Sequence, residues 1–171
     1  ATPQRSISVA GDWGWKSTVE AEGTVASGLA SDAAALSMVC SNAAAIDVGD
    51  TLLIQSERVF VSDRAFAALG SILINGALTA AKAGVSVTVD GSHGIVAREV
   101  IQVGSEWMYV SSVAGNVLTV IRAYDGSLLA AHADDSPVLI ARTLTIERAV
   151  NGTTAAVHAN ATAVSRYRVP R

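Results

Sequence analysis

The sequence predicts an all-β protein of two small β-barrel or sandwich modules, one inserted into a hairpin of the other, with little helix. Three observations support this fold class: a repeat offset by 26 residues, a second repeat offset by 49 residues, and short apolar segments punctuated by glycine and asparagine. Half of the 171 residues are apolar, yet only 5% are aromatic. We therefore expect a core of mainly aliphatic side chains.

The first repeat aligns residues 118–138 with residues 144–164 without a gap. In each copy a strand-like segment ends in Arg-Ala-x-(Asp/Asn)-Gly and continues through small residues to His-Ala. The positions of the first copy that carry the same residue type in the second are Leu118, Thr119, Arg122, Ala123, Gly126, Ala130, His132, Ala133 and Val138.

The second repeat aligns residues 50–61 with residues 99–110. Both segments show apolar residues at alternate positions, a Ser-Glu turn and a second β-branched or aromatic run, which is typical of two paired strands. Weaker matches at the same offset extend the repeat back to Leu29 and Leu78.

Combining the two offsets gives one complete module at residues 65–142 and one split module at residues 21–64 plus 143–171, preceded by an N-terminal strand or arm at residues 1–20. Insertion at an exposed hairpin tip is tolerated because the two chain ends lie close together there. We therefore expect residues 57–61 to pair with residues 144–148. The alternative, three incomplete tandem copies, would leave half-modules with unpaired strand edges.

The N-terminal segment alternates polar and apolar residues over positions 5–15, as a strand with one buried face does. Trp13 and Trp15 place two large apolar side chains close together in a chain with few aromatic residues. They suit either a plug for the end of a barrel or an anchor between subunits. Residues 18–35 keep neither the helix nor the strand period, so we expect a loop with one short helical turn.

The repeated polar residues form a structural loop motif. Gly126 and Gly152 are expected to supply a turn with positive φ. Arg122 and Arg148 are expected to bind carbonyls of the wide loop, whose far end His132 and His158 hold. Metal binding is the rival interpretation, but the first copy has aspartates at 134 and 135 where the second has Asn160 and Ala161. We expect structural histidines and no metal.

No motif in the sequence points to catalysis. Glu57 and Glu106 occupy equivalent turns of two modules, so we expect each to cap its own turn and not to act as a paired-carboxylate hydrolase. The glycines are scattered through turns, which leaves no phosphate-binding loop and no expected cofactor. Cys40, between apolar neighbours, is expected to be a small buried residue. His93 has no evident partner and is expected to face solvent.

Bulk charge excludes further classes of function. The net charge of -3 gives no basic field for wrapping nucleic acid, and the only local cationic run is Arg166, Arg168 and Arg171. No apolar run approaches the roughly 18 residues that a membrane-spanning helix needs. We expect no membrane association.

Four stretches of the sequence resemble proteins of known families. Residues 48–57 (Val-Gly-Asp-x-Leu-x-Ile-x-x-Glu) and the Arg-x-x-x-Gly-Thr-x-Ala-x-x-His run of residues 148–158 are similar to small β-modules of structural proteins from tailed bacteriophages. Residues 9–15 resemble the strand and turn of head-tail connector, or adaptor, proteins, and residues 166–170 resemble the exit from such a module. The sequence shows none of the helices that normally follow in connectors, so either they lie outside this chain or the protein is a different virion part.

The resemblance implies a non-enzymatic virion protein of the head-tail connector or neck that forms a homo-oligomeric ring. Its partners would be portal, neck or tail proteins, with genomic DNA passing without sequence-specific binding. The expected interface residues are Trp13, Trp15, Trp107, Tyr109, Arg166, Arg168 and Arg171. The alternative is a tail-tip, fibre or capsid-surface module in which Trp107 and Tyr109 bind a host glycan or receptor.

Overall fold

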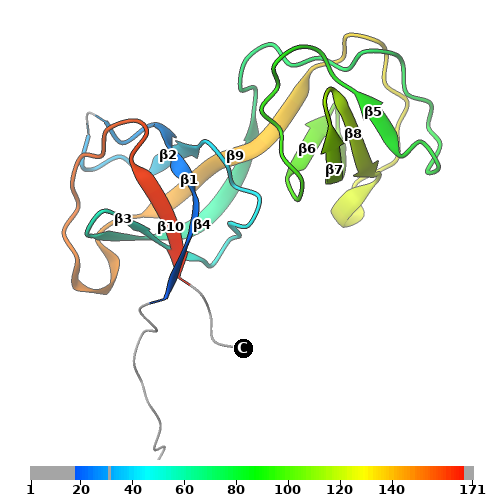
Figure 1. Ribbon diagram of the computed structural model, residues 1–171. Coiled ribbons are helices and arrows are strands. Elements are labelled where there is room, and N and C mark those ends of the chain that lie inside the picture. Colours follow the sequence, from blue (N-terminus) through cyan, green and yellow to red (C-terminus); the bar gives the residue numbers. More distant parts are fainter. Residues whose placement is uncertain (1–17, 31, 168–171) are drawn as a thin grey trace, which may run out of the picture.

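The structure is a computed structural model that describes residues 18–30 and 32–167. It is all-β, with 47% of residues in strands and 4% in helix, as the sequence predicts. The strands are β1 (Val19–Ser27), β2 (Ser37–Cys40), β3 (Thr51–Ile54), β4 (Glu57–Ala67), β5 (Ser86–Thr88), β6 (Val100–Val103), β7 (Glu106–Ala114), β8 (Val117–Ile121), β9 (Val138–Glu147) and β10 (Ala163–Tyr167). Two 3-10 turns, η1 (Tyr124–Gly126) and η2 (Val150–Gly152), complete the elements (Figure 1).

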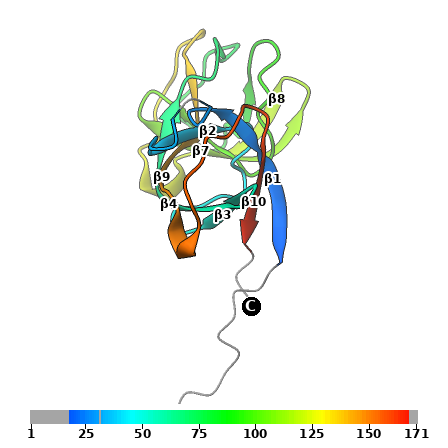
Figure 2. The ribbon, with the colours of Figure 1, turned by 90° about the vertical axis from the view of Figure 1, so that its left-hand side faces the viewer.

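Six strands close into the outer barrel, in the order β2-β1-β10-β3-β4-β9, and β2 pairs again with β9 to complete the ring (Figure 2). All of these pairings are antiparallel. A closed ring leaves no free strand edge between its first and last strands.

The pairing of the two distant halves of the outer barrel confirms the nested arrangement. Strand β4 pairs with β9 in a register that sets Phe60 opposite Glu147 and Val61 opposite Ile146. These residues were expected to pair because the two repeats give two complete modules only if one module is inserted into the other. Both strands continue past the outer barrel and carry the chain into the second lobe (Figure 1).

The inner barrel repeats the same ring. Strands β6, β7, β8 and β5 follow one another from the first half of β9. Leu73 and Ile74 take the place that β1 has in the outer barrel. Their isolated bridges, Leu73 to Pro137 and Ile74 to Val89, close the ring. The register is conserved between the copies: Val164 faces Ile54 in the outer barrel, and at the offsets of 26 and 49 Val138 faces Val103 in the inner barrel.

Each barrel has its own core, and each core is aliphatic. Buried residues of the outer core include Leu52, Ile54 and Leu144, and those of the inner core include Ile101 and Ile140. No aromatic side chain belongs to either cluster as the described residues define them. The composition predicts this, and the described aromatic residues are half-buried or exposed except Tyr167, which is buried.

Strand β1 corrects the expectation of a loop with a helical turn at residues 18–35. Its register shifts between Ala21 and Gly23, where a bulge interrupts the pairing with β10. A bulge inserts one residue into the two-residue strand period, so the alternation that would have revealed the strand is broken at that point. The strand also begins at Val19, inside the segment expected to be a separate arm.

The expected module boundaries at residues 64/65 and 142/143 fall inside β4 and β9, which are continuous there. The expected strand at residues 5–15, with Trp13 and Trp15, lies outside the described residues. Over the described part of the chain no helix has the length and apolar character that crossing a bilayer requires.

Candidate functional site

The inner barrel contains a buried carboxylate at the start of β7 that accepts five hydrogen bonds. Glu106 is fully buried, and Arg122 reaches it with Nε at 3.0 Å from Oε1 and Nη2 at 2.6 Å from Oε2. The backbone amides of Ala123 and Ala130 donate at 3.0 and 3.1 Å, and His132 Nε2 lies 2.8 Å from Oε2. The two-pronged arginine contact is the strongest geometry available to such a pair.

The outer barrel contains the same cluster at the offsets of 49 and 26. Arg148 Nε and Nη2 lie 2.6 and 2.7 Å from the carboxylate oxygens of Glu57. The amides of Ala149 and Ala156 donate at 3.1 and 3.0 Å, and His158 Nε2 lies 2.8 Å from Oε2. In the sequence Glu57 and Arg148 are 91 residues apart, whereas the inner pair is separated by only 16 residues.

The hydrogen bonds decide the ionisation of both carboxyl groups. Burial alone would raise the pKa of Glu57 and of Glu106. The arginine, the histidine and the two backbone amides together outweigh burial and lower each pKa to about 2. Both groups are therefore carboxylates at neutral pH.

Local backbone conformation positions the donors. Each Glu follows a two-residue turn whose first residue has positive φ, Gln55 at 56° and Gly104 at 58°. After each arginine the chain turns through an alanine in the left-handed region and closes at Gly126 (φ 77°) or Gly152 (φ 76°), as the repeat predicts. The wide loop that follows returns to the carboxylate through its amide and its histidine.

The sequence predicted the two arginines and two histidines as structural residues, and their contacts agree with that role. Arg122 donates to the carbonyl of Ala130 and Arg148 to that of Ala156, both in the wide loop. The partnership with Glu57 and Glu106 was not predicted. The available signal was chemical: a buried arginine needs a counter-charge, and Glu57 and Glu106 are the one acidic position that keeps the same residue at the offset of 49.

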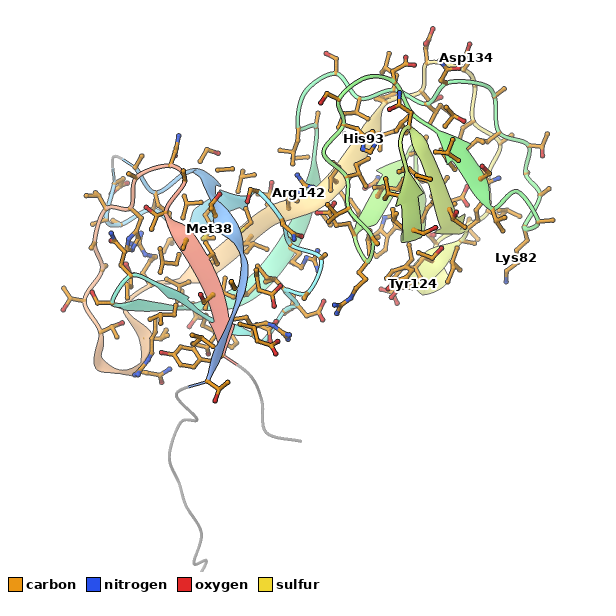
Figure 3. The ribbon with its side chains drawn as sticks, viewed as in Figure 1. Met38, Lys82, His93, Tyr124, Asp134 and Arg142 are labelled. Carbon is orange, nitrogen blue, oxygen red and sulfur yellow. The ribbon has the colours of Figure 1, made fainter. Side chains whose placement is uncertain are left out.

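Two further arginines fix the junction between the barrels. Arg64 on β4 donates to the carbonyls of Ile46, Ala43 and Ala141. Arg142 on β9 binds both oxygens of Glu99, at 2.6 and 2.8 Å. Arg64 thus binds a loop of the outer barrel, and Arg142 binds the equivalent loop of the inner barrel. Figure 3 shows Arg142 between the two lobes.

A cleft of about 280 Å³ lies at this junction. Three of its lining side chains are aromatic, three are carboxylates and one is a guanidinium. The lining residues are Asp47, Val48, Asp63, Arg64, Phe66, Val100, Trp107, Tyr124, Asp125 and Ala141. None of the acidic members was singled out from the sequence, because none is repeated.

Trp107 and Tyr109, expected on an exposed hairpin, are half-buried beside this cleft. Trp107 packs against Phe66 with the ring centroids 5.1 Å apart, and Tyr109 stacks on Tyr124 at 5.3 Å. The structure brings these two expected interface residues together. Trp13, Trp15, Arg168 and Arg171 lie outside the described residues.

Arg166, also expected at an interface, is engaged within its own chain. Its Nε lies 3.3 Å from Glu22, and further nitrogens lie 3.7 Å from Glu20 and from Asp50. The side chain is partly exposed, so these contacts hold it along the surface of the outer barrel.

The structure also places Cys40 and His93, about which the sequence made predictions. Cys40 is buried in the outer core as expected, and burial raises the pKa of its thiol to about 12. His93 is not free in solvent: its Nδ1 accepts from the amide of Ile95, and its Nε2 lies 3.1 Å from the carbonyl of Gly115. Within the described ranges no three His, Cys, Asp or Glu side chains converge as metal ligands would.

The geometry therefore consists of two saturated buried clusters and one open cleft. Each cluster can hold a loop in place, and its carboxylate has no vacant position for a reacting group. The cleft exposes aromatic rings and carboxylates that still have unused hydrogen-bond acceptor positions. Comparison of the chain with protein-family models, with curated proteins and with solved structures finds no match.

Proposed function

We propose that the protein is a non-enzymatic structural component of a tailed-phage virion, located at the head-tail connector or neck, where copies of the chain assemble into a symmetric ring. The similarity of the Arg-x-x-x-Gly-Thr-x-Ala-x-x-His run of residues 148–158 to phage β-modules is the basis for the virion assignment. Portal, neck or tail proteins are the partners of such a ring, and DNA passes through it without sequence-specific contacts.

The observation that supports a structural role best is the use of the buried charges. The buried carboxylates among the described residues are Glu57, Glu99 and Glu106, and an arginine binds each of them. Burying and pairing these charges holds the loops in place. Glu57 and Glu106, each with a pKa lowered to about 2, are not poised to exchange a proton near neutral pH. Rigid loops at defined positions suit a component that must present the same surface to every neighbour.

Exposed aliphatic side chains supply the material for contacts between subunits. Leu128 is 81% exposed and Leu36 is 61% exposed, and both lie in loops next to the buried clusters. The outer barrel is closed and offers no free strand edge between its first and last strands, so its contacts with another subunit use side chains. The exposed leucines are available for such contacts.

The mass of the purified full chain in solution tests this proposal. We expect one closed oligomer whose population grows with protein concentration, and antibodies against the chain that label phage particles at the neck. A protein that stays monomeric at the highest attainable concentration, together with particles that do not label, would refute the proposal.

A further inference from the structure

The cleft between the barrels carries uncompensated negative charge. Its single cation, Arg64, is already committed to backbone carbonyls and to Asp47, 3.2 Å away. Asp63 accepts one hydrogen bond, from the backbone of its neighbour in the chain. Asp125 accepts none from the described residues, and both aspartates are exposed. A ligand with positive charge would therefore find two free carboxylates.

The outer barrel shows how the same place is filled when the chain supplies its own cation. Trp107 corresponds to Arg58 at the offset of 49, and the Arg58 guanidinium lies 5.4 Å from the centroid of the Tyr167 ring. Arg58 also donates to the hydroxyl of Tyr167 and to the carbonyl of Asn151. This is a cation held by an aromatic face and by oxygen atoms.

The inner barrel has lost that cation and gained a negative charge. Where the outer barrel has Arg58 the inner has Trp107, and where it has Asn151 the inner has Asp125. Ala141 replaces Tyr167 and lines the open cleft. Asp63, Asp125 and the aromatic rings beside them thus have no equivalent of Arg58, and Arg64, the cation of the cleft, is bound to Asp47. This favours a basic side chain over a neutral sugar as the ligand.

The charge distribution of the chain identifies a source of that side chain. Residues 18–167 contain 14 acidic and 8 basic residues, a net charge of -6. Residues 1–17 and 168–171 contain one acidic and four basic residues, a net charge of +3, which together give the -3 of the whole chain. The terminal segments are therefore complementary in charge to the described body.

Composition separates the two terminal segments. Residues 1–17 contain Arg5 and Lys16 together with Trp13 and Trp15, whereas residues 168–171 contain two arginines and no aromatic residue. A cleft that combines carboxylates with aromatic rings favours the segment that offers both basic and aromatic side chains.

We propose that the cleft lined by Asp63, Asp125 and the rings of Phe66, Trp107 and Tyr124 binds a basic side chain from the N-terminal segment of a second copy of this chain. The segment offers Arg5 and Lys16 as cations, with Trp13 and Trp15 as aromatic neighbours. Such a head-to-tail contact generates a closed ring when the rotation between copies is suitable. The inference rests on the proposed assembly role.

Neutralising variants of the full chain test the contact. The double variants Asp63→Asn/Asp125→Asn and Arg5→Gln/Lys16→Gln should each weaken assembly by about tenfold, measured as the shift in the concentration of half-assembly, because each removes the charges of one side. Asp125→Asn introduces the residue that Asn151 already provides at the same backbone conformation, φ 51° against 54°. Unchanged unfolding midpoints show that the variants still fold.

Matched controls locate the effect. Asp135→Asn removes an exposed aspartate with φ 60°, next to Asp134 at the opposite end of the inner barrel from Tyr124 (Figure 3), and should not change assembly. Arg168→Gln/Arg171→Gln removes the cations of residues 168–171 and should likewise leave assembly intact. Loss of assembly in this last variant alone would assign the wrong segment and overturn the proposal.

A charge exchange is the decisive experiment. Asp63→Lys/Asp125→Asn and Arg5→Glu/Lys16→Glu should each fail to assemble alone. An equimolar mixture should assemble, because every reversed cleft can then meet a reversed arm and every wild-type cleft a wild-type arm. Failure of the mixture, or cleft variants that assemble like the wild type, would overturn this inference while the assembly role stands. A monomeric wild type would overturn the assembly role itself. Glycan-array binding that is lost in Trp107→Ala would make the cleft a carbohydrate site instead.

Discussion

The two barrels share one buried cluster but reach it along different routes through the chain. In the inner barrel the glutamate and the arginine are 16 residues apart and lie within one continuous segment. In the outer barrel they are 91 residues apart, and the whole inner barrel lies between them. The hydrogen bonds are the same in number and nearly the same in length. Equal local geometry has thus been built on unequal connectivity, so the clusters should be alike in energy and unlike in cooperativity.

Removal of the buried arginines should have the largest effect. Arg122→Met and Arg148→Met each leave a buried carboxylate without its guanidinium, and breaking such a pair costs about 3–5 kcal/mol in the free energy of unfolding. Urea unfolding measures the cost. Hydrogen exchange should then show faster opening of β3 and β4 in Arg148→Met and of β6 and β7 in Arg122→Met.

Double variants provide the control for this experiment. Glu57→Gln/Arg148→Met and Glu106→Gln/Arg122→Met remove both charges and should be less destabilised than the arginine variants alone, because no buried charge remains unpaired. If either arginine variant accelerates exchange equally in both barrels, the two lobes open as a single unit and the expected difference in cooperativity is wrong.

Acid should weaken both clusters next in order of magnitude. The pKa of Glu57 and of Glu106 falls from 4.5 to about 2 in the folded protein, so each carboxylate stabilises the fold fully above pH 4.5 and loses that contribution as the pH falls toward 2. At neutral pH each contributes on the order of 3 kcal/mol. Unfolding free energies measured from pH 6 to pH 2 should show the decline.

Glutamine variants test the source of the acid effect. Glu57→Gln and Glu106→Gln should each flatten the pH dependence by a similar amount, since the donors around the two carboxylates match. Glu147→Gln, at an exposed position of β9, should leave it unchanged. A flattening by only one of the glutamine variants would mean that the two clusters are not equivalent in energy.

The sequence predicted the architecture because the repeat offsets carry three-dimensional information. The two repeats give two complete modules only in a nested arrangement. That arrangement requires Val61 to lie near Ile146, as observed. Strand β1 was missed because its bulge at Ala21 and Gly23 breaks the strand period. Aliphatic cores followed from the composition alone.

The candidate sites were less predictable for a physical reason. Repeats reveal what the two copies share, so the arginines and histidines of the clusters stood out, but burial of Glu57 and Glu106 is a tertiary property. The cleft depends on what the copies do not share, such as Tyr167 against Ala141. A difference of this kind indicates a cleft only once the fold shows that Asp63 and Phe66 of β4 lie beside it.

Thiol labelling should reveal a smaller difference between the barrels. The Cys40 thiol is buried and, with its pKa raised by burial to about 12, stays protonated, so it reacts only when the outer barrel opens. In Cys40→Val/Val89→Cys the thiol moves to the equivalent buried position of the inner barrel. Strands β1 and β10 close the outer barrel from the ends of the described chain, so labelling at position 40 should be about tenfold faster than at position 89. Equal rates would indicate joint opening.

Exchange of Gln55 and Gly104 should produce the smallest effect, because two terms oppose each other. The positive φ of 56° at Gln55 costs about 1–2 kcal/mol in folding free energy. Its Oε1 lies 3.0 Å from His158 Nδ1, and this hydrogen bond stabilises the fold by about 1 kcal/mol. Gly104 has φ 58° and avoids the strain, but it leaves His132 Nδ1 without that partner; a Cβ there would lie 3.8 Å from this nitrogen. Gln55→Gly and Gly104→Gln should each change the unfolding free energy by less than about 1 kcal/mol. A loss above about 2 kcal/mol in Gln55→Gly would show that the outer cluster, whose halves come from distant parts of the chain, depends on a histidine contact that the inner cluster does without.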